Sequence, residues 1–200
     1  RKRNGEWRKL ANQNLNLGYR IKKVILSFDN DDWFEKMMST LDTDKWFTEN
    51  DKSEGRVVII NGPNLNFLGV REIEKYGSFS YEELKNKVLK GTNRSIHFFQ
   101  SNSEGDIVKL IQALVRIENE NQDSEIIGLV INPGGLTHTS VSLRDALSML
   151  LMPIVEVHIT DITQREKYRK TNLISDLCLK SIIGKGIDGY IEGVEYLYTL

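Results

Sequence analysis

Short apolar runs alternate along the chain with segments of helical periodicity, from residue 56 to the end. The runs are rich in β-branched residues, as buried parallel strands are, and they lie at residues 57–60, 96–100, 126–131, 154–157 and 178–183. Apolar residues recur at helical spacing in residues 81–89, 104–117, 140–151 and 190–200. This alternation over short connections predicts an α/β fold, a doubly wound five-stranded parallel sheet with helices on both faces. Ligands of such sheets bind beyond the carboxyl ends of the strands.

The first 55 residues differ from the rest because their charges are segregated. Basic residues dominate residues 1–23, and an acidic stretch with interspersed aromatic and apolar residues follows at 29–54. The pattern predicts an N-terminal extension at 1–55, with one or two short amphipathic helices, ahead of one catalytic domain at 56–200. Its role stays open: an arm that packs on the domain or on a neighbouring subunit, a trimmed targeting sequence, or an interaction arm.

Charge and hydropathy exclude some partners. A formal net charge of −1 over 200 residues gives no general attraction to nucleic acid, so only residues 1–23 offer a local candidate for such contact and none is expected. No run approaches the roughly 18 to 20 apolar residues that span a bilayer, so no membrane partner is expected. The single cysteine, Cys178, cannot form an intrachain disulfide. We expect a cytoplasmic location, with an organelle as the alternative if the extension is a targeting remnant.

Polar residues that a strand-loop-helix scaffold does not require gather directly after the predicted strands. Asn64, Arg71 and Tyr76 follow the first strand, in a segment whose glycines and proline indicate a tight turn and a mobile loop. Asn132 and His138 follow the third strand. Taken singly, each has a structural explanation, since asparagines form turns and a tyrosine before glycine often anchors a loop.

The fourth strand ends in a second group of polar residues. Glu156 and His158 are two residues apart and therefore point to the same face of the strand. Arg165 and Arg169 follow at a spacing of one helical turn and could share a face. His97, by contrast, lies inside a predicted strand with no motif around it, and we interpret it as structural.

The strings NGPNLNFLG, RE-x3-YG, QSNSEG, INPGGLTHTSVSLRDAL and PIVEVHITD resemble those of type II 3-dehydroquinate dehydratases, over roughly residues 56–200. Motifs in the family's order and spacing make the resemblance specific, and independent turn residues would not reproduce them. It implies a flavodoxin-like domain, a homo-oligomer built as a trimer-based dodecamer, and no cofactor or metal. The implied reaction is dehydration of the small-molecule substrate 3-dehydroquinate to 3-dehydroshikimate, in the shikimate or quinate pathway.

The resemblance also implies a stepwise anti elimination through an enolate. Tyr76, as phenolate, would remove the proton next to the ketone, Asn64 would support the enolate, and His158 would protonate the departing hydroxyl. A phenol with a pKa near 10 is a poor base at neutral pH unless a cation stabilises the phenolate. Arg71 would supply it, since unit charges about 4 Å apart interact by ~4 kcal/mol at an effective dielectric of ~20. Glu156 would orient the His158 imidazole.

The same resemblance assigns the substrate contacts. They fall on the side chains of Asn132, His138 and Arg169 and on the backbone of Ile159 and Thr160. Arg169 suits a carboxylate because a guanidinium binds it in bidentate fashion. Asp145 would reach the active site of a neighbouring subunit. Gly69 and Gly77 would let the segment that carries Arg71 and Tyr76 close as a lid.

The chain departs from the family pattern at three places. Thr160 and Asp161 stand where the family commonly has Ser-Asn, and the charge of Asp161 is expected to weaken binding of the substrate carboxylate. Ser103 replaces a frequent histidine, and residues 170–176 differ from the usual sequence. All the proposed catalytic residues are present.

Other function classes fit less well. A non-catalytic oligomeric scaffold built on the dehydroquinase fold would explain the long extension, but it has no use for the intact catalytic set. The G-x-G-x-x-G pattern at residues 184–189 is followed by too few residues for a second strand and a ribose-binding acid, so we expect no dinucleotide site. Three histidines and one cysteine show no metal-site spacing.

Overall fold

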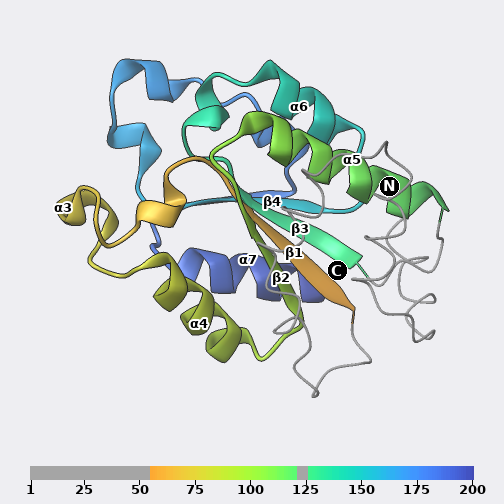
Figure 1. Ribbon diagram of the computed structural model, residues 1–200, viewed down its shortest axis with the longest axis horizontal. Helices are drawn as coiled ribbons and strands as arrows, with labels where there is room; N and C mark the ends of the chain where they lie inside the picture. Colours follow the sequence, from red (N-terminus) through yellow and green to blue (C-terminus); the bar gives the residue numbers. More distant parts are fainter. Residues whose placement is uncertain (1–54, 121–125) are drawn as a thin grey trace.

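The computed structural model describes residues 55–120 and 126–200, so the predicted extension, apart from its last residue, lies outside the described residues. Within them, five parallel strands form one sheet in the order β2-β1-β3-β4-β5 (Figure 1). The strands are β1 (Arg56–Asn61), β2 (Ile96–Gln100), β3 (Ile126–Asn132), β4 (Ile154–His158) and β5 (Lys180–Ile183). The predicted fold class is confirmed.

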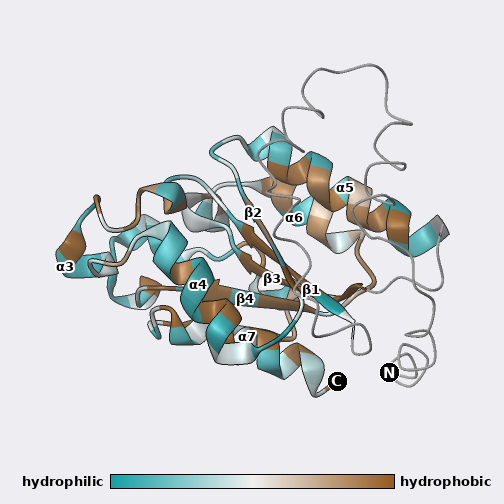
Figure 2. Cartoon of the chain, turned by 60° about the horizontal axis from the view of Figure 1, so that its bottom comes forward, coloured by the Kyte–Doolittle hydropathy of each residue, from teal (hydrophilic) through white to brown (hydrophobic). Residues whose placement is uncertain are grey.

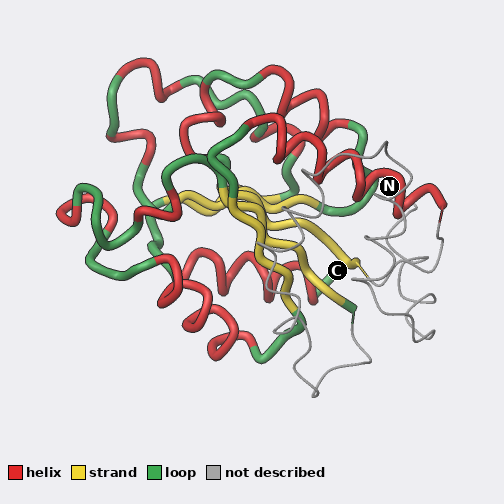
Figure 3. The backbone as a smooth tube through the Cα atoms, in the orientation of Figure 1, coloured by secondary structure: helices red, strands yellow, loops and turns green. Residues whose placement is uncertain are grey.

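Helices cover both faces of the sheet (Figures 1 and 3). One face carries α5 (Glu104–Glu120) and α6 (Val141–Ser148), and the other carries α4 (Tyr81–Thr92) and α7 (Asp188–Tyr198). None of the described helices is long and apolar enough to cross a membrane. The short helices between the main elements were not predicted: α3 (Ile73–Tyr76), η3 (Leu65–Phe67), η4 (Gly134–His138), η5 (Ile162–Gln164), η6 (Lys167–Lys170) and η7 (Ser175–Leu177).

Two apolar cores hold the layers together, because side chains alternate between the two faces of each strand. Along β1, Val58 and Ile60 join the core beneath α5 and α6, whereas Val57 and Ile59 join the core above α4 and α7. Figure 2 shows the corresponding hydrophobic strands between helices whose outer faces are hydrophilic. Burial on both faces explains why the strands read as continuous apolar runs.

The carboxyl ends of the central strands coincide. Asn61 pairs with Asn132 across β1 and β3, and Ile131 pairs with Glu156 across β3 and β4. The loops after β1 and β3 then touch through their backbones, since a Cβ on Gly62 would lie 2.2 Å from the Pro133 carbonyl oxygen. The register therefore brings the polar residues that follow these strands to one edge of the sheet.

Candidate active site

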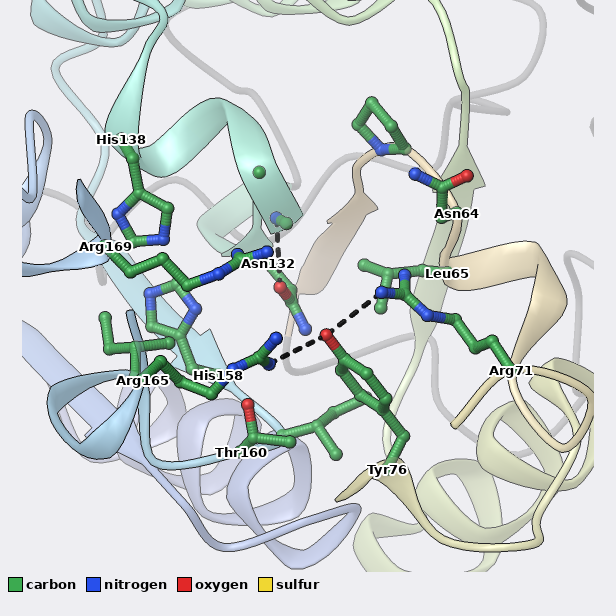
Figure 4. Close-up of a pocket in the computed structure, with 15 residues that line it drawn as sticks. Asn64, Leu65, Arg71, Tyr76, Asn132, His138, His158, Thr160, Arg165 and Arg169 are labelled. Atoms are coloured by element: carbon green, nitrogen blue, oxygen red, sulfur yellow. Dashed lines mark hydrogen bonds between the residues drawn. The ribbon is translucent and has the colours of Figure 1, made fainter. Parts of the chain in front are cut away.

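A cavity of about 100 Å³ lies at this edge (Figure 4). All the residues predicted for the site line it except Glu156 and Asp145: Asn64, Arg71, Tyr76, Asn132, His138, His158, Ile159, Thr160 and Arg169. Glu156 lies directly behind His158, to which it is hydrogen-bonded. Residues from segments far apart in the sequence thus share one cavity.

The phenol oxygen of Tyr76 accepts hydrogen bonds from two guanidinium groups. Arg71 Nη2 and Arg165 Nη1 each donate to it over 3.0 Å. The two arginines reach the oxygen from different sides (Figure 4), and the guanidinium carbon of Arg71 lies 4.3 Å from the ring centroid. The hydrogen bond to Tyr76 raises the pKa of Arg165. Two charged donors therefore meet at one phenol oxygen.

Arg165 lines the cavity, although the sequence analysis did not assign it to the site. Its spacing from Arg169 suggested a shared helical face, but it caps the end of η5 in extended backbone while Arg169 belongs to the separate helix η6. Arg165 turns toward Tyr76, and Arg169 Nε donates to Glu166 over 2.9 Å. The available signal was its position in the loop after β4, where other predicted site residues lie, although its partner Tyr76 is 89 residues away.

Asn64 precedes η3 in a left-handed backbone conformation, with φ 67°. Asn102 holds Asn64 in this conformation, since the backbone N–H of Asn64 donates to Asn102 Oδ1 over 2.8 Å. Gly69 and Gly77, predicted to free the lid backbone, also have positive φ, at 80° and 88°. Side chains with a Cβ rarely adopt such values, so both glycines are needed for the path of the loop.

His158 and Glu156 form a buried pair at the end of β4. His158 Nε2 lies 2.7 Å from Glu156 Oε1, and Glu156 has no exposed surface. Burial opposes ionisation of the carboxyl group, but bonds from His158, Ser181 and Asn172 outweigh it and hold the pKa of Glu156 below its ordinary value. Since a carboxylate only accepts, Nε2 carries the hydrogen and Nδ1 is the ring nitrogen left for the cavity.

His138 offers the opposite nitrogen to the cavity. Its Nδ1 lies 2.7 Å from the Thr171 carbonyl oxygen and must donate to it, so Nε2 remains an acceptor. Burial lowers the pKa of His138 and favours the neutral ring. A neutral imidazole with a free acceptor suits a substrate hydroxyl.

A buried hydrogen-bond chain fixes the Asn132 amide. Its Nδ2 donates to the Tyr190 hydroxyl over 2.7 Å, its Oδ1 accepts from the Gly134 N–H over 3.2 Å, and Tyr190 donates to Asn61 Oδ1 over 2.6 Å. Burial raises the pKa of Tyr190, so the hydroxyl stays protonated. These hydrogen bonds thus determine which way Asn132 presents its side-chain amide to a ligand.

Two acidic residues point elsewhere. Asp145 is exposed on α6, outside the cavity, and its predicted role in a neighbouring subunit's site stays a prediction. Asp161, expected to place a charge near the substrate carboxylate, does not line the cavity either. Its Oδ1 accepts from the backbone N–H and the hydroxyl of Thr163, over 2.9 and 2.6 Å, so the carboxylate caps η5.

The remaining sequence features have structural roles. The first two glycines of the G-x-G-x-x-G pattern lie in the turn after β5, where the Gly184 N–H donates to the His158 carbonyl and the Gly186 N–H to that of Ile159, and the third, Gly189, belongs to α7. Ser103, in place of a histidine, accepts from the Asp106 N–H near the start of α5. In residues 55–120 and 126–200, no group of three or more His, Cys, Asp or Glu side chains could hold a metal.

Comparison with known proteins gives consistent matches. A family described as "Dehydroquinase class II" matches residues 55–198. The 3-dehydroquinate dehydratase of Fusobacterium nucleatum is 43% identical over 147 residues, which cover 71% of this chain and 95% of that protein. The one from Halothermothrix orenii is 40% identical over 148 residues, covering 72% and 95%.

Solved structures agree. The type II dehydroquinase of Propionibacterium acnes superposes with a TM-score of 0.66 at 28% identity, covering 73% of this chain and 97% of the other. That of Butyrivibrio crossotus gives a TM-score of 0.65 at 38% identity, covering 72% and 97%. The chain therefore belongs to the class II dehydroquinase family.

Proposed function

We propose that the chain is a hydro-lyase that dehydrates 3-dehydroquinate to 3-dehydroshikimate in the shikimate pathway. Membership of the family and relatives named 3-dehydroquinate dehydratase support this reaction. The observation that carries it is the Tyr76 oxygen, held between two guanidinium groups in a cavity that His158 also lines. A non-catalytic scaffold has no need of this arrangement.

The first step is removal of a proton from the carbon next to the ketone. The Tyr76 phenolate takes the proton, and the electron pair moves onto the ketone oxygen to form an enolate. The two guanidinium groups stabilise the phenolate before the transfer, which makes a phenol an effective base near neutral pH. Asn64 lines the same cavity and would donate to the enolate oxygen, directly or through water.

The second step expels the tertiary hydroxyl. The enolate reforms the ketone, the new carbon–carbon double bond forms, and the carbon–oxygen bond breaks while His158 delivers a proton, so water leaves. The buried Glu156 carboxylate, 2.7 Å from Nε2, keeps the imidazole in place as it gains and loses that proton. The proton on Tyr76 then returns to solvent and His158 takes up another, which restores both groups.

Three side chains and two backbone positions bind the substrate in this proposal. Arg169 pairs with the carboxylate, together with the backbone of Ile159 and Thr160 at the end of β4. Asn132 and the neutral His138 bind hydroxyl groups. Each lines the cavity.

The α6 face supports the proposed trimer-based dodecamer. Val141, Met149 and Leu151, at or beside α6, expose 59%, 46% and 52% of their surface, and Asp145 is exposed on the same helix. Exposed apolar side chains of this size favour a subunit contact. In the assembly Asp145 would complete a neighbour's site. Cofactor independence, a cytoplasmic location and the division at residue 55 stay predictions.

Adding the purified chain to 3-dehydroquinate tests the proposal, because the product's conjugated enone carboxylate absorbs in the ultraviolet. We expect absorbance to rise with the unmodified chain and to stay at background with Tyr76→Phe and His158→Ala. A folded, unmodified oligomer that yields no product contradicts the proposed function. Full activity of Tyr76→Phe would remove Tyr76 from the role of base.

A further inference from the structure

Thr171 and Asn172, which follow η6, contact one cavity-lining histidine directly and the other through its carboxylate partner. The Thr171 carbonyl oxygen accepts from His138 Nδ1, and the Asn172 side chain reaches Glu156, the partner of His158. The dipeptide belongs to the segment 170–176, whose sequence departs from the family pattern. It therefore links the two sides of the cavity through groups that do not line it.

The orientation of the Asn172 amide is determined by its surroundings. Its Oδ1 accepts from the backbone N–H groups of Ile174 and Ser175, over 3.0 and 3.1 Å. Only an oxygen can accept both bonds, so Nδ2 must face Glu156, where it lies 2.7 Å from Oε1. The turn and the contact with Glu156 thus use the two ends of one amide.

Asn172 completes a set of three donors on a buried carboxylate. Oε1 of Glu156 accepts hydrogen bonds from His158 Nε2 and Asn172 Nδ2, and Oε2 accepts one from the Ser181 hydroxyl over 2.7 Å. A buried carboxylate keeps its charge only when such bonds replace water. The charge of Glu156 also acts on Cys178, since burial, first of all, and this charge raise the pKa of the Cys178 thiol to about 12.

We infer that Asn172 is a positioning residue: by donating to Glu156 it keeps that carboxylate charged and in place, so that His158 carries hydrogen on Nε2 and turns Nδ1 to the substrate. The inference rests on the proposed function, in which His158 delivers the proton to the leaving hydroxyl. Asn172 touches no substrate in this account. It acts on the second step of the reaction, through Glu156.

Asn172→Asp is the sharpest test, because it separates the two ends of the amide. One carboxylate oxygen can still accept from Ile174 and Ser175, so the turn is retained, but the other oxygen faces Glu156 without a hydrogen to donate. We expect kcat to fall about tenfold to a hundredfold, the usual effect of losing a hydrogen bond to a charged group, with KM nearly unchanged. Asn86→Asp, on the exposed face of α4, is the matched control and should behave as the unmodified chain.

The pH dependence gives a signature that a loss of folding would not produce. Two carboxylates in contact take up a proton more readily than one alone, and that proton restores a donor between them. The other titratable groups near Glu156 are His158, His138 and Cys178. We therefore expect the activity of Asn172→Asp, relative to the unmodified chain, to rise as the pH falls. A ratio that does not vary with pH contradicts the inference.

Imidazole nitrogen NMR tests the positioning without any turnover. The chain has only 3 histidines, so ¹⁵N-labelled protein can be assigned with single substitutions. We expect neutral His158 to carry its hydrogen on Nε2 in the unmodified chain, and this tautomer to lose population in Asn172→Asp and in Asn172→Ala. Unchanged His158 signals in both variants would overturn the inference. An inactive unmodified chain with the expected signals would instead refute the proposed function.

Discussion

Replacing Arg165 tests whether two cations are needed on the Tyr76 oxygen. Arg165→Met keeps much of the side-chain volume but removes the guanidinium that donates over 3.0 Å, and Arg71 remains at the same distance. A hydrogen bond to a charged partner contributes about 1.5–3 kcal/mol. We therefore expect kcat/KM near neutral pH to fall about tenfold to 150-fold, at about 1.4 kcal/mol for each factor of ten.

The pH profile separates this cause from a general disturbance of the site. Removing a positive charge disfavours the phenolate, so a more alkaline solution is needed to form it. The pH at which kcat/KM reaches half its maximum should therefore rise. Enone absorbance measured from about pH 6 to about pH 10 would follow the change. Arg165→Lys, which keeps a cation, should lie between Arg165→Met and the unmodified chain.

Lys90→Met is the control for loss of a positive charge, because Lys90 is exposed in the last turn of α4. It should keep the profile of the unmodified chain. If Arg165→Met loses activity while its pH midpoint stays unchanged, Arg165 does not stabilise the phenolate, and the two-cation reasoning is refuted.

Two further predictions concern buried residues. Tyr190→Phe removes the hydroxyl between Asn132 and Asn61, so thermal or denaturant unfolding should show a loss of about 1–3 kcal/mol, and KM should rise because the Asn132 amide is no longer fixed. An unchanged KM would show that these hydrogen bonds do not affect substrate binding. Burial lowers the pKa of His97 to about 3, so between about pH 3 and 6.5 the unfolded chain binds more protons than the folded one. The free energy of unfolding should then fall by up to about 1.4 kcal/mol for each unit of pH lost in this window, and His97→Leu should flatten the slope; equal slopes would count against the buried neutral ring.

The sequence predicted the sheet because local pattern and tertiary burial agree there. The strands are buried on both faces, and their apolar runs mark them directly. The prediction was wrong at the start of β5, which begins at Lys180 rather than at Cys178. Cys178 closes η7 by donating to the Ser175 carbonyl, and Leu179 is 56% exposed, so apolar character at these positions does not reflect a strand.

The site could be predicted only where a motif or a strand period marks it. Glu156 and His158 are related by the two-residue period of a strand, and this relation holds in the structure as a 2.7 Å contact. Asn172 and Tyr190 are 16 and 58 residues away from the partners they contact. The segment around Asn172 has no periodic signal, and the helical spacing of residues 190–200 predicts a helix but not the partner of Tyr190. Such contacts depend on how the short 3-10 turns and α7 pack, which local spacing does not encode.

The central claim is that Tyr76 removes the proton next to the ketone. The most direct measurement uses 3-dehydroquinate that carries one deuterium at that carbon, anti to the leaving hydroxyl, with product formation followed by absorbance and its isotope content by mass spectrometry. We expect the unmodified chain to form product that has lost the deuterium, more slowly than from unlabelled substrate, and Tyr76→Phe to form none above background. Equal product formation by Tyr76→Phe, or no product from the folded unmodified chain, would contradict this claim.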